Sequence, residues 1–209
     1  MAVFNPSYPL DIPAVSGFVN SQLQLARTTA ITTSSFTYQS QVQQFEGEVW
    51  TADFRLAPMR RADAALWQAF FVQLRGRRGT FRLGDPDNNA LLGAATGTIR
   101  VNGAGQTGNQ VALDGFANST NNVLKAGDYI QINSYMYLVT ANANSNGSGE
   151  ADVKIEPALR QSIETISDNT IITYGSSAKT VWRMDDNTLG WDGDRVSRYG
   201  FNFSCTEAL

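Results

Sequence analysis

The clearest hydrophobic pattern in the chain is an alternation of apolar and polar positions between residues 48 and 56. Four apolar side chains share one face: Trp50, Ala52, Phe54 and Leu56. A period of two predicts a strand with one buried face. The same period returns near the end of the chain, at Tyr199, Phe201, Phe203 and Cys205. There it predicts a final strand, in which Cys205 is a small buried side chain and not a reactive thiol.

A different period predicts one helix after Pro58. Apolar residues recur there at spacings of three and four, at Leu66, Trp67, Phe70, Phe71 and Leu74. This spacing forms one apolar stripe on a helix, and Gly76 suits its C-terminal cap. Residues 80–83 then predict a short strand, followed by a loop over residues 84–89. Before the helix, residues 28–45 are rich in β-branched and aromatic residues but alternate imperfectly, so they predict one or two strands.

The middle of the chain has a composition of its own. Eleven of the 16 asparagines lie between Asn88 and Asn146, and glycines are frequent in the same stretch. Short apolar segments separate these turn-forming residues, which predicts a small barrel or sandwich of short strands. We therefore expect a mainly β fold with two parts. Residues 1–88 and 161–209 form a discontinuous β-sandwich with one packed α-helix, and residues 89–160 form an inserted, barrel-like all-β module.

The composition of the chain excludes several classes of catalytic and metal site. The 209 residues include no histidine and one cysteine, and the net charge is −3. These counts exclude a Ser-His-Asp or Cys-His nucleophile, a His-ligated zinc and an internal disulfide. No apolar run reaches the roughly 20 residues that span a membrane, and the first residues lack the features of a secretory signal. We expect a protein made in the cytoplasm, with no metal and no cofactor.

Arginine is concentrated around the predicted helix. Seven of the 16 basic residues lie between Arg55 and Arg82, and Arg75, Arg77 and Arg78 flank two glycines. Such a turn suits a protein interface, internal ion pairs or, less well in an acidic chain, phosphate binding. The proline-rich first 20 residues, with Phe4 and Tyr8, predict an extended arm. This arm either packs on its own domain or crosses to another subunit.

Several other groups have ordinary explanations beside their chemical ones. The acidic turns at 185–187 and 192–194 lack EF-hand spacing and suit turns better than calcium. Glu46 and Glu48 fit two exposed acids better than a glycosidase pair. The glycines at 103, 105 and 108 precede no helix, so they predict turns and not a dinucleotide site. Trp191 lies in a polar turn and is a candidate exposed aromatic for glycan binding.

Two stretches resemble a known family. The first comprises WTADF at 50–54, Pro58-Met59, AALWQAFFVQLRGRRG at 64–79 and TFRLGDP at 80–86; the second comprises LKAGDYIQI at 124–132, YLV at 137–139 and IEPALR at 155–160. In this order they resemble tail-tip proteins of long-tailed, siphovirus-like bacteriophages and gene-transfer agents, over roughly half of the chain. The resemblance implies a distal tail protein, a non-enzymatic virion component of the phage tail.

In that family a β-sandwich with one helix forms a ring, usually of six copies, which joins the tail tube to the hub that carries receptor-binding parts. The resemblance therefore implies three partners: copies of the chain itself, the tube protein and the hub proteins. It implies no membrane, and nucleic acid only as DNA passing through the ring. The expected subunit contacts are Arg75, Arg77, Arg78, Arg82, Phe4 and Tyr8. The alternatives are a carbohydrate-binding module on a phage or bacterial surface protein and a neighbouring tube or minor tail protein.

Overall fold

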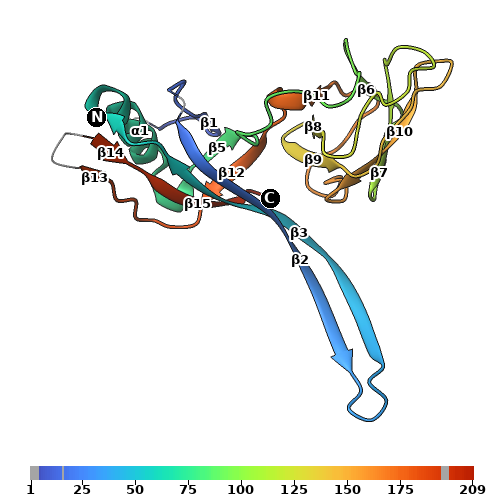
Figure 1. Cartoon of the computed structure of the whole chain (residues 1–209), viewed down its shortest axis with the longest axis horizontal. Helices are drawn as coiled ribbons and strands as arrows, with labels where there is room; N and C mark the ends of the chain where they lie inside the picture. The colour runs from blue at the N-terminus through green and yellow to red at the C-terminus, as the bar shows by residue number, and fades with distance from the viewer. Residues whose placement is uncertain (1–4, 16, 194–197) are drawn as a thin grey trace.

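The computed structural model describes residues 5–15, 17–193 and 198–209. It is mainly β with a single α-helix among these residues, which confirms the expected fold class. Figure 1 shows two β bodies side by side and a long hairpin that projects away from both. The first body contains the helix and the strands of residues 10–83 and 180–207, and we call it the ring domain; the second contains the strands of residues 100–174 and is the inserted module.

A six-stranded sheet forms the ring domain. Its strands, in spatial order, are β1 (Leu10–Asp11), β5 (Thr80–Leu83), β12 (Thr180–Met184), β15 (Asn202–Glu207), β3 (Ser40–Leu56) and β2 (Phe18–Thr33). β1 pairs with β5 in parallel, and the other neighbours are antiparallel. The sheet combines strands from both ends of the chain, so the ring domain is discontinuous. Its outgoing and returning strands are neighbours, because Leu83 is the register partner of Thr180.

The helix α1 (Arg61–Leu74) buries Trp67, Phe70, Phe71 and Leu74 of its predicted stripe, whereas Leu66 is 54% exposed. Trp67 is fully buried, and its ring centroid lies 6.4 Å from that of Phe203 on β15. A three-stranded sheet of β13 (Asp192–Gly193), β14 (Arg198–Gly200) and β4 (Met59–Arg60) lies next to the helix. The helix ends one residue before the expected cap: Arg75 takes the left-handed conformation, with φ 54°. The 3-10 turn η1 (Gly76–Arg78) follows directly.

The inserted module is a second six-stranded sheet. Its spatial order is β11 (Ile172–Tyr174), β8 (Tyr129–Ile132), β9 (Tyr135–Val139), β10 (Ala151–Glu156), β7 (Gln110–Asp114) and β6 (Arg100–Val101). The edge strands approach each other through a bridge between Arg100 and Ile171, so the sheet is a nearly closed barrel. Closure removes exposed edges and encloses a separate apolar core, which includes Leu113, Tyr137 and Val153.

The sheet pairing places the end of the module later than the expected residue 160. Strand β11 pairs with β8, and both Ile166 and Ile172 belong to the core of the module. The apolar run at 170–174 resembles a ring-domain strand in sequence, but here its side chains complete the barrel. The module therefore extends to the 3-10 turn η2 (Gly175–Ser177), directly before β12.

Candidate functional site

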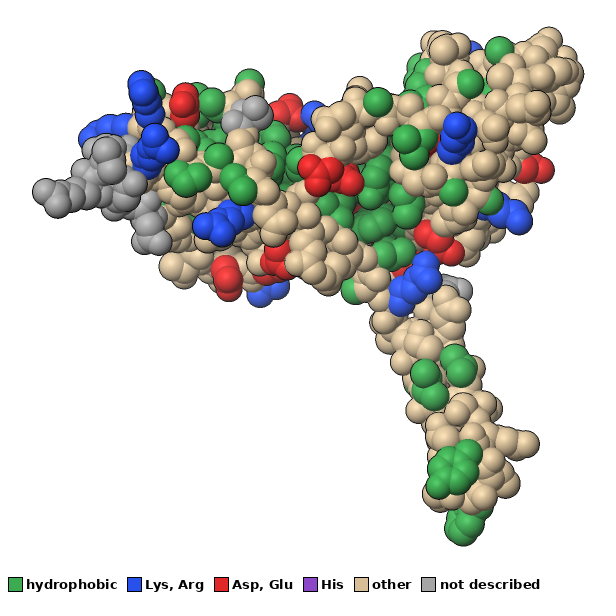
Figure 2. Space-filling model, in the orientation of Figure 1, with side chains coloured by type: hydrophobic (Ala, Val, Ile, Leu, Met, Phe, Trp, Pro, Cys, Tyr) green, Lys and Arg blue, Asp and Glu red, His purple; other side chains and the backbone are tan. Residues whose placement is uncertain are grey.

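The most distinctive surface of the molecule is the projecting hairpin of β2 and β3. Apart from Ser34, every residue from 28 to 45 whose exposure is described is exposed to solvent. These 18 residues include no charged side chain and no proline. Phe36 and Tyr38 at the tip are 94% and 82% exposed, and Figure 2 shows hydrophobic side chains gathered at the end of the projection. The sequence predicted strands here but not that they would leave the body.

Hydrogen bonds within the tip hold its shape. The Ser34 hydroxyl accepts bonds from the backbone N–H groups of Phe36 and Thr37, both at 3.3 Å. The Tyr38 N–H donates to the Ser34 carbonyl at 2.9 Å, and Tyr38 itself is left-handed, with φ 55°. A turn closed in this way presents its two aromatic rings from a defined backbone.

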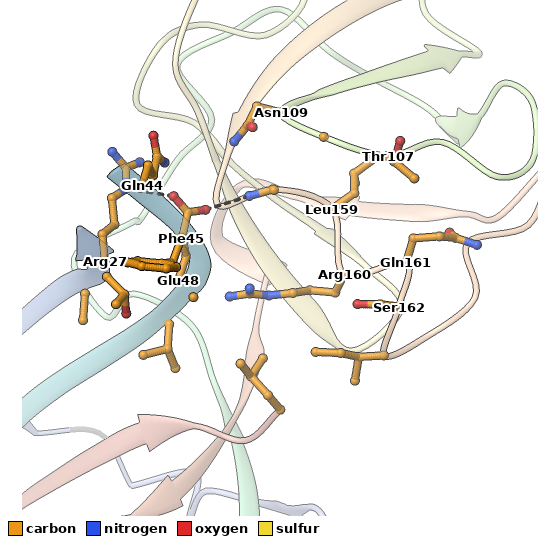
Figure 3. A pocket seen from close by; sticks show the side chains of 18 residues that line it. Arg27, Gln44, Phe45, Glu48, Thr107, Asn109, Leu159, Arg160, Gln161 and Ser162 are labelled. Carbon is orange, nitrogen blue, oxygen red and sulfur yellow. Dashed lines mark hydrogen bonds and ion pairs between the residues drawn. The ribbon is translucent and has the colours of Figure 1, made fainter. Parts of the chain in front are cut away.

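A cleft of about 950 Å³ lies where the hairpin meets the inserted module (Figure 3). On the hairpin side it is lined by Arg27, Gln44, Phe45 and Glu48, among others. On the module side it is lined by Thr107, Asn109 and the segment 158–163. Phe45 and Ile163 keep 45% and 46% of their surface exposed, so part of this lining is apolar and open to solvent.

Ion pairs fasten the hairpin root to the module across this cleft. Glu48 lies 3.0 Å from Arg27 Nε, and Arg27 Nη2 lies 2.8 Å from Glu156 at the end of β10. The other oxygen of Glu48 accepts the Ala158 N–H at 3.0 Å. Glu48 is only 6% exposed, so the expectation that it is an exposed acid is wrong. Its carboxylate is buried because two donors satisfy it.

A second, deeper ion pair joins the same segment to the last strand. Arg160 Nη2 lies 2.8 Å from Glu207, whose carboxylate also accepts the Trp50 N–H at 3.2 Å and the Thr180 hydroxyl at 3.0 Å. Burial raises the pKa of Glu207, and Arg160 opposes this shift. The Arg160 side chain is only 8% exposed, and yet its Nε has no hydrogen-bond partner within the described part of the chain.

The arginine turn directly precedes β5, near the sheet edge that lies away from the hairpin strands β2 and β3. Arg183 Nη1 donates to the backbone carbonyls of Arg77 and Arg78, at 2.6 and 3.0 Å, and so fixes the turn. The side chains of Arg75, Arg77 and Arg78 are exposed. A small cleft of about 330 Å³ brings Arg75 together with Trp191, which is 43% exposed. Two residues predicted on separate grounds therefore share one site.

The N-terminal arm packs on its own domain from residue 5 onward. The Tyr8 hydroxyl donates to the Gln73 carbonyl at 2.7 Å, and Arg82 pairs with Asp11 at 3.4 Å. Trp67 Nε1 donates to the Val15 carbonyl at 3.2 Å. Tyr8 and Arg82 thus make contacts within the chain, and their part in a subunit interface stays a prediction. Phe4 lies outside the described residues.

The remaining sequence candidates take ordinary structural roles. Gly103, Gly105 and Gly108 all have left-handed φ angles in the loop before β7, which confirms the turn prediction. Cys205 is fully buried, as expected, and burial raises the pKa of its thiol. Asp185 accepts a bond from the Thr206 hydroxyl at 2.7 Å. Asp194 lies outside the described residues.

The described residues contain neither a metal-binding cluster nor a membrane-spanning helix. No group of three or more acidic, cysteine or histidine side chains within residues 5–15, 17–193 and 198–209 is placed to hold a metal ion. In the same ranges, no helix has the length and apolar character needed to cross a membrane. The chain matches no protein-family model, and a search of curated proteins also gives no match.

Proposed function

We propose that this chain is a non-enzymatic structural subunit of a bacteriophage tail tip: a distal tail protein that assembles with copies of itself into a ring, with six as the expected number. The ring connects the tail tube to the hub, and the inserted module projects from it. The motifs between Trp50 and Pro86, and between Leu124 and Arg160, suggest this family. A protein with this role would be located in the virion.

The observation that carries the proposal is the uncharged hairpin over residues 28–45. A two-stranded ribbon by itself is at best marginally stable in water. Proteins normally protect such a ribbon with charges, prolines or a covering element, because an open strand edge pairs readily with other chains. This hairpin has neither charge nor proline, and β2 is the edge strand of its sheet. Its composition fits a segment that a protein partner covers.

In a ring of identical subunits, every hairpin has one neighbouring subunit that can cover it. When identical subunits join head to tail, each uses two different surfaces, and a rotation that closes yields a ring. The hairpin continues β2 and β3 at one edge of the sheet (Figure 1), and the arginine turn precedes β5 near the other edge, so the subunit offers more than one surface for such contacts. A subunit with this arrangement requires no chemistry beyond specific contacts.

The test measures the mass of the purified chain in solution and images it by electron microscopy. We expect rings of uniform diameter in the intact chain. The matched variant replaces residues 30–43 by Asn-Gly, which joins the register partners Thr29 and Gln44 through a two-residue hairpin turn. We expect this variant to be a monomer with an unchanged melting temperature. Monomers of the intact chain at every concentration, or rings of the shortened variant, would contradict the proposal.

One observation favours a second role, glycan binding. Trp191 is exposed beside Asn187 in the small cleft, and an aromatic face next to polar groups is a suitable platform for a sugar. A glycan array with the intact chain and with Trp191→Ala tests this role. Binding that the substitution abolishes would support it, and an array without signal would remove it.

A further inference from the structure

We infer that the hairpin tip of one copy docks into the cleft between the hairpin root and the inserted module of the next copy. The tip consists of residues 34–39, and the cleft is the one lined by Phe45, Leu159 and Ile163. The inference rests on the proposed ring and identifies one pair of surfaces that meet in it.

The tip cannot reach the cleft of its own chain. Thr28 and Gln44 line the cleft, and the hairpin runs from there to the tip without a sharp bend (Figure 1). Strands rise about 3.3 Å per residue, so the six residues from Thr28 to Thr33 carry the tip on the order of 20 Å away. A tip that enters this cleft therefore belongs to a different molecule.

Charge favours this occupant. The charged side chains among the described lining residues each have a counter-ion: Arg27 pairs with Glu48 and Glu156, and Arg160 pairs with Glu207. A charged segment entering the cleft would lose water without gaining a new counter-ion. The tip has no charge and carries the two most exposed large hydrophobic side chains of the described residues, Phe36 and Tyr38. An uncharged aromatic tip thus matches a cleft whose charges are compensated.

Arg160 supplies an independent sign that the cleft receives a partner. Its guanidinium extends into the region between the module and the hairpin root in Figure 3, and the side chain is more than nine-tenths buried. Its Nε is the single buried side-chain donor or acceptor of the described residues that has no partner. Leaving a buried donor unpaired is costly, and a small shift of the Arg160 side chain would let a carbonyl or hydroxyl oxygen of the tip pair with it.

Each copy contributes one tip and one cleft. Contacts of this kind are heterologous, so they build a closed ring or an open helix and not a two-fold dimer. The tip would enter with the Tyr38 and Phe36 rings against Phe45, Leu159 and Ile163. The neighbouring copy would then cover the tip of the hairpin, which is exposed to solvent in the single chain.

Disulfide cross-linking tests the contact directly. Tyr38→Cys and Ile163→Cys are made in separate chains, both at exposed positions, and Cys205 remains as the fully buried natural thiol. After mixing and mild oxidation we expect a covalent dimer of the two variants. We expect no covalent dimer from either variant alone. Covalent dimers from Tyr38→Cys alone would place tip against tip and overturn the inference, as would the absence of mixed dimers from assembled chains.

Assembly of substituted chains separates this inference from the proposed function. We expect Phe36→Ser and Ile163→Asp each to raise the concentration needed for assembly at least about tenfold. Leu92→Ser and Ile171→Asp are the matched controls, because they alter exposed side chains of the module outside the cleft. Rings that form equally well in all four variants would overturn the tip-and-cleft contact and leave the ring intact. An intact chain that stays monomeric would overturn both.

Discussion

Glu207 and Arg160 form a buried ion pair, 2.8 Å apart, between the last strand of the ring domain and the segment that follows β10. Neither side chain is more than 8% exposed. Removing one partner of such a pair leaves an uncompensated buried charge, which is far more costly than the pair is stabilising. The pair therefore makes the relative placement of the two bodies sensitive to a single side chain.

We expect Glu207→Gln to remove a pH-dependent part of the free energy of unfolding, because the variant cannot ionise at this position. Burial raises the pKa of Glu207 above its ordinary 4.5. As pH rises from 4.5 to the folded-state pKa, the unfolded chain ionises first, so the margin of the wild-type chain over the variant shrinks. Urea unfolding at several pH values measures this margin, with Asp152→Asn as an exposed control. A margin that grows with pH would contradict the direction of the shift.

Glu48→Ala removes the acceptor that Arg27 and the Ala158 N–H share. A buried donor left without an acceptor costs about 1–3 kcal/mol, so we expect a loss of stability of that size. The local consequence is more specific: the amide of Ala158 should exchange with deuterium faster, while amides of the module core keep their protection. Unchanged exchange at Ala158 would show that Glu48 does not hold this segment.

Gly84 lies where the chain leaves the ring domain, and a Cβ at this position would collide with the carbonyl of Ala178. We expect Gly84→Ala to destabilise the chain by about 1–3 kcal/mol, because backbone must shift to admit the methyl group. Gly190→Ala is the matched control, since a Cβ there meets no atom within 4 Å. Thermal unfolding of both variants measures the difference, and equal melting temperatures would contradict the close approach.

Arg77→Glu combined with Arg78→Glu tests the arginine turn as a subunit contact. Both side chains are exposed, so we expect the stability of the monomer to change by less than about 0.5 kcal/mol while ring formation is lost. Arg100→Glu with Lys154→Glu reverses two exposed charges of the module and serves as the control. Light scattering reads out assembly. Rings that form normally after reversal at 77 and 78 would remove the turn from the interface.

Much of the fold could be predicted from local patterns. The alternation at 50–56 and the helical stripe from Trp67 to Leu74 each identify a buried face, because burial follows periodicity, although Leu66 of the predicted stripe is exposed. Pairing across long sequence distances could not be predicted in this way. The run at 170–174 would suit either sheet, and only its contact with β8 assigns it to the module.

The ion pairs of the cleft could be predicted only in part from the sequence. Glu48 continues the apolar face of Trp50, Ala52 and Phe54, and Glu207 continues that of Cys205. A carboxylate in phase with a buried face requires a partner, but the sequence does not reveal that the partners are Arg27 and Arg160. The sequence also contains an indication of the hairpin. Its 18 residues carry no charge, which is typical of a strand pair that is covered by another surface.

The pairing of Leu83 with Thr180 has a consequence for how such proteins diversify. Residues opposite each other in antiparallel strands have Cα atoms only about 5 Å apart. Any domain whose own ends lie that close together can be exchanged at this position as a cassette, without stretching the sheet that receives it. Recombination between the flanking strands β5 and β12 would then replace the inserted module and leave the rest of the fold unchanged. The same position is suitable for inserting an engineered domain.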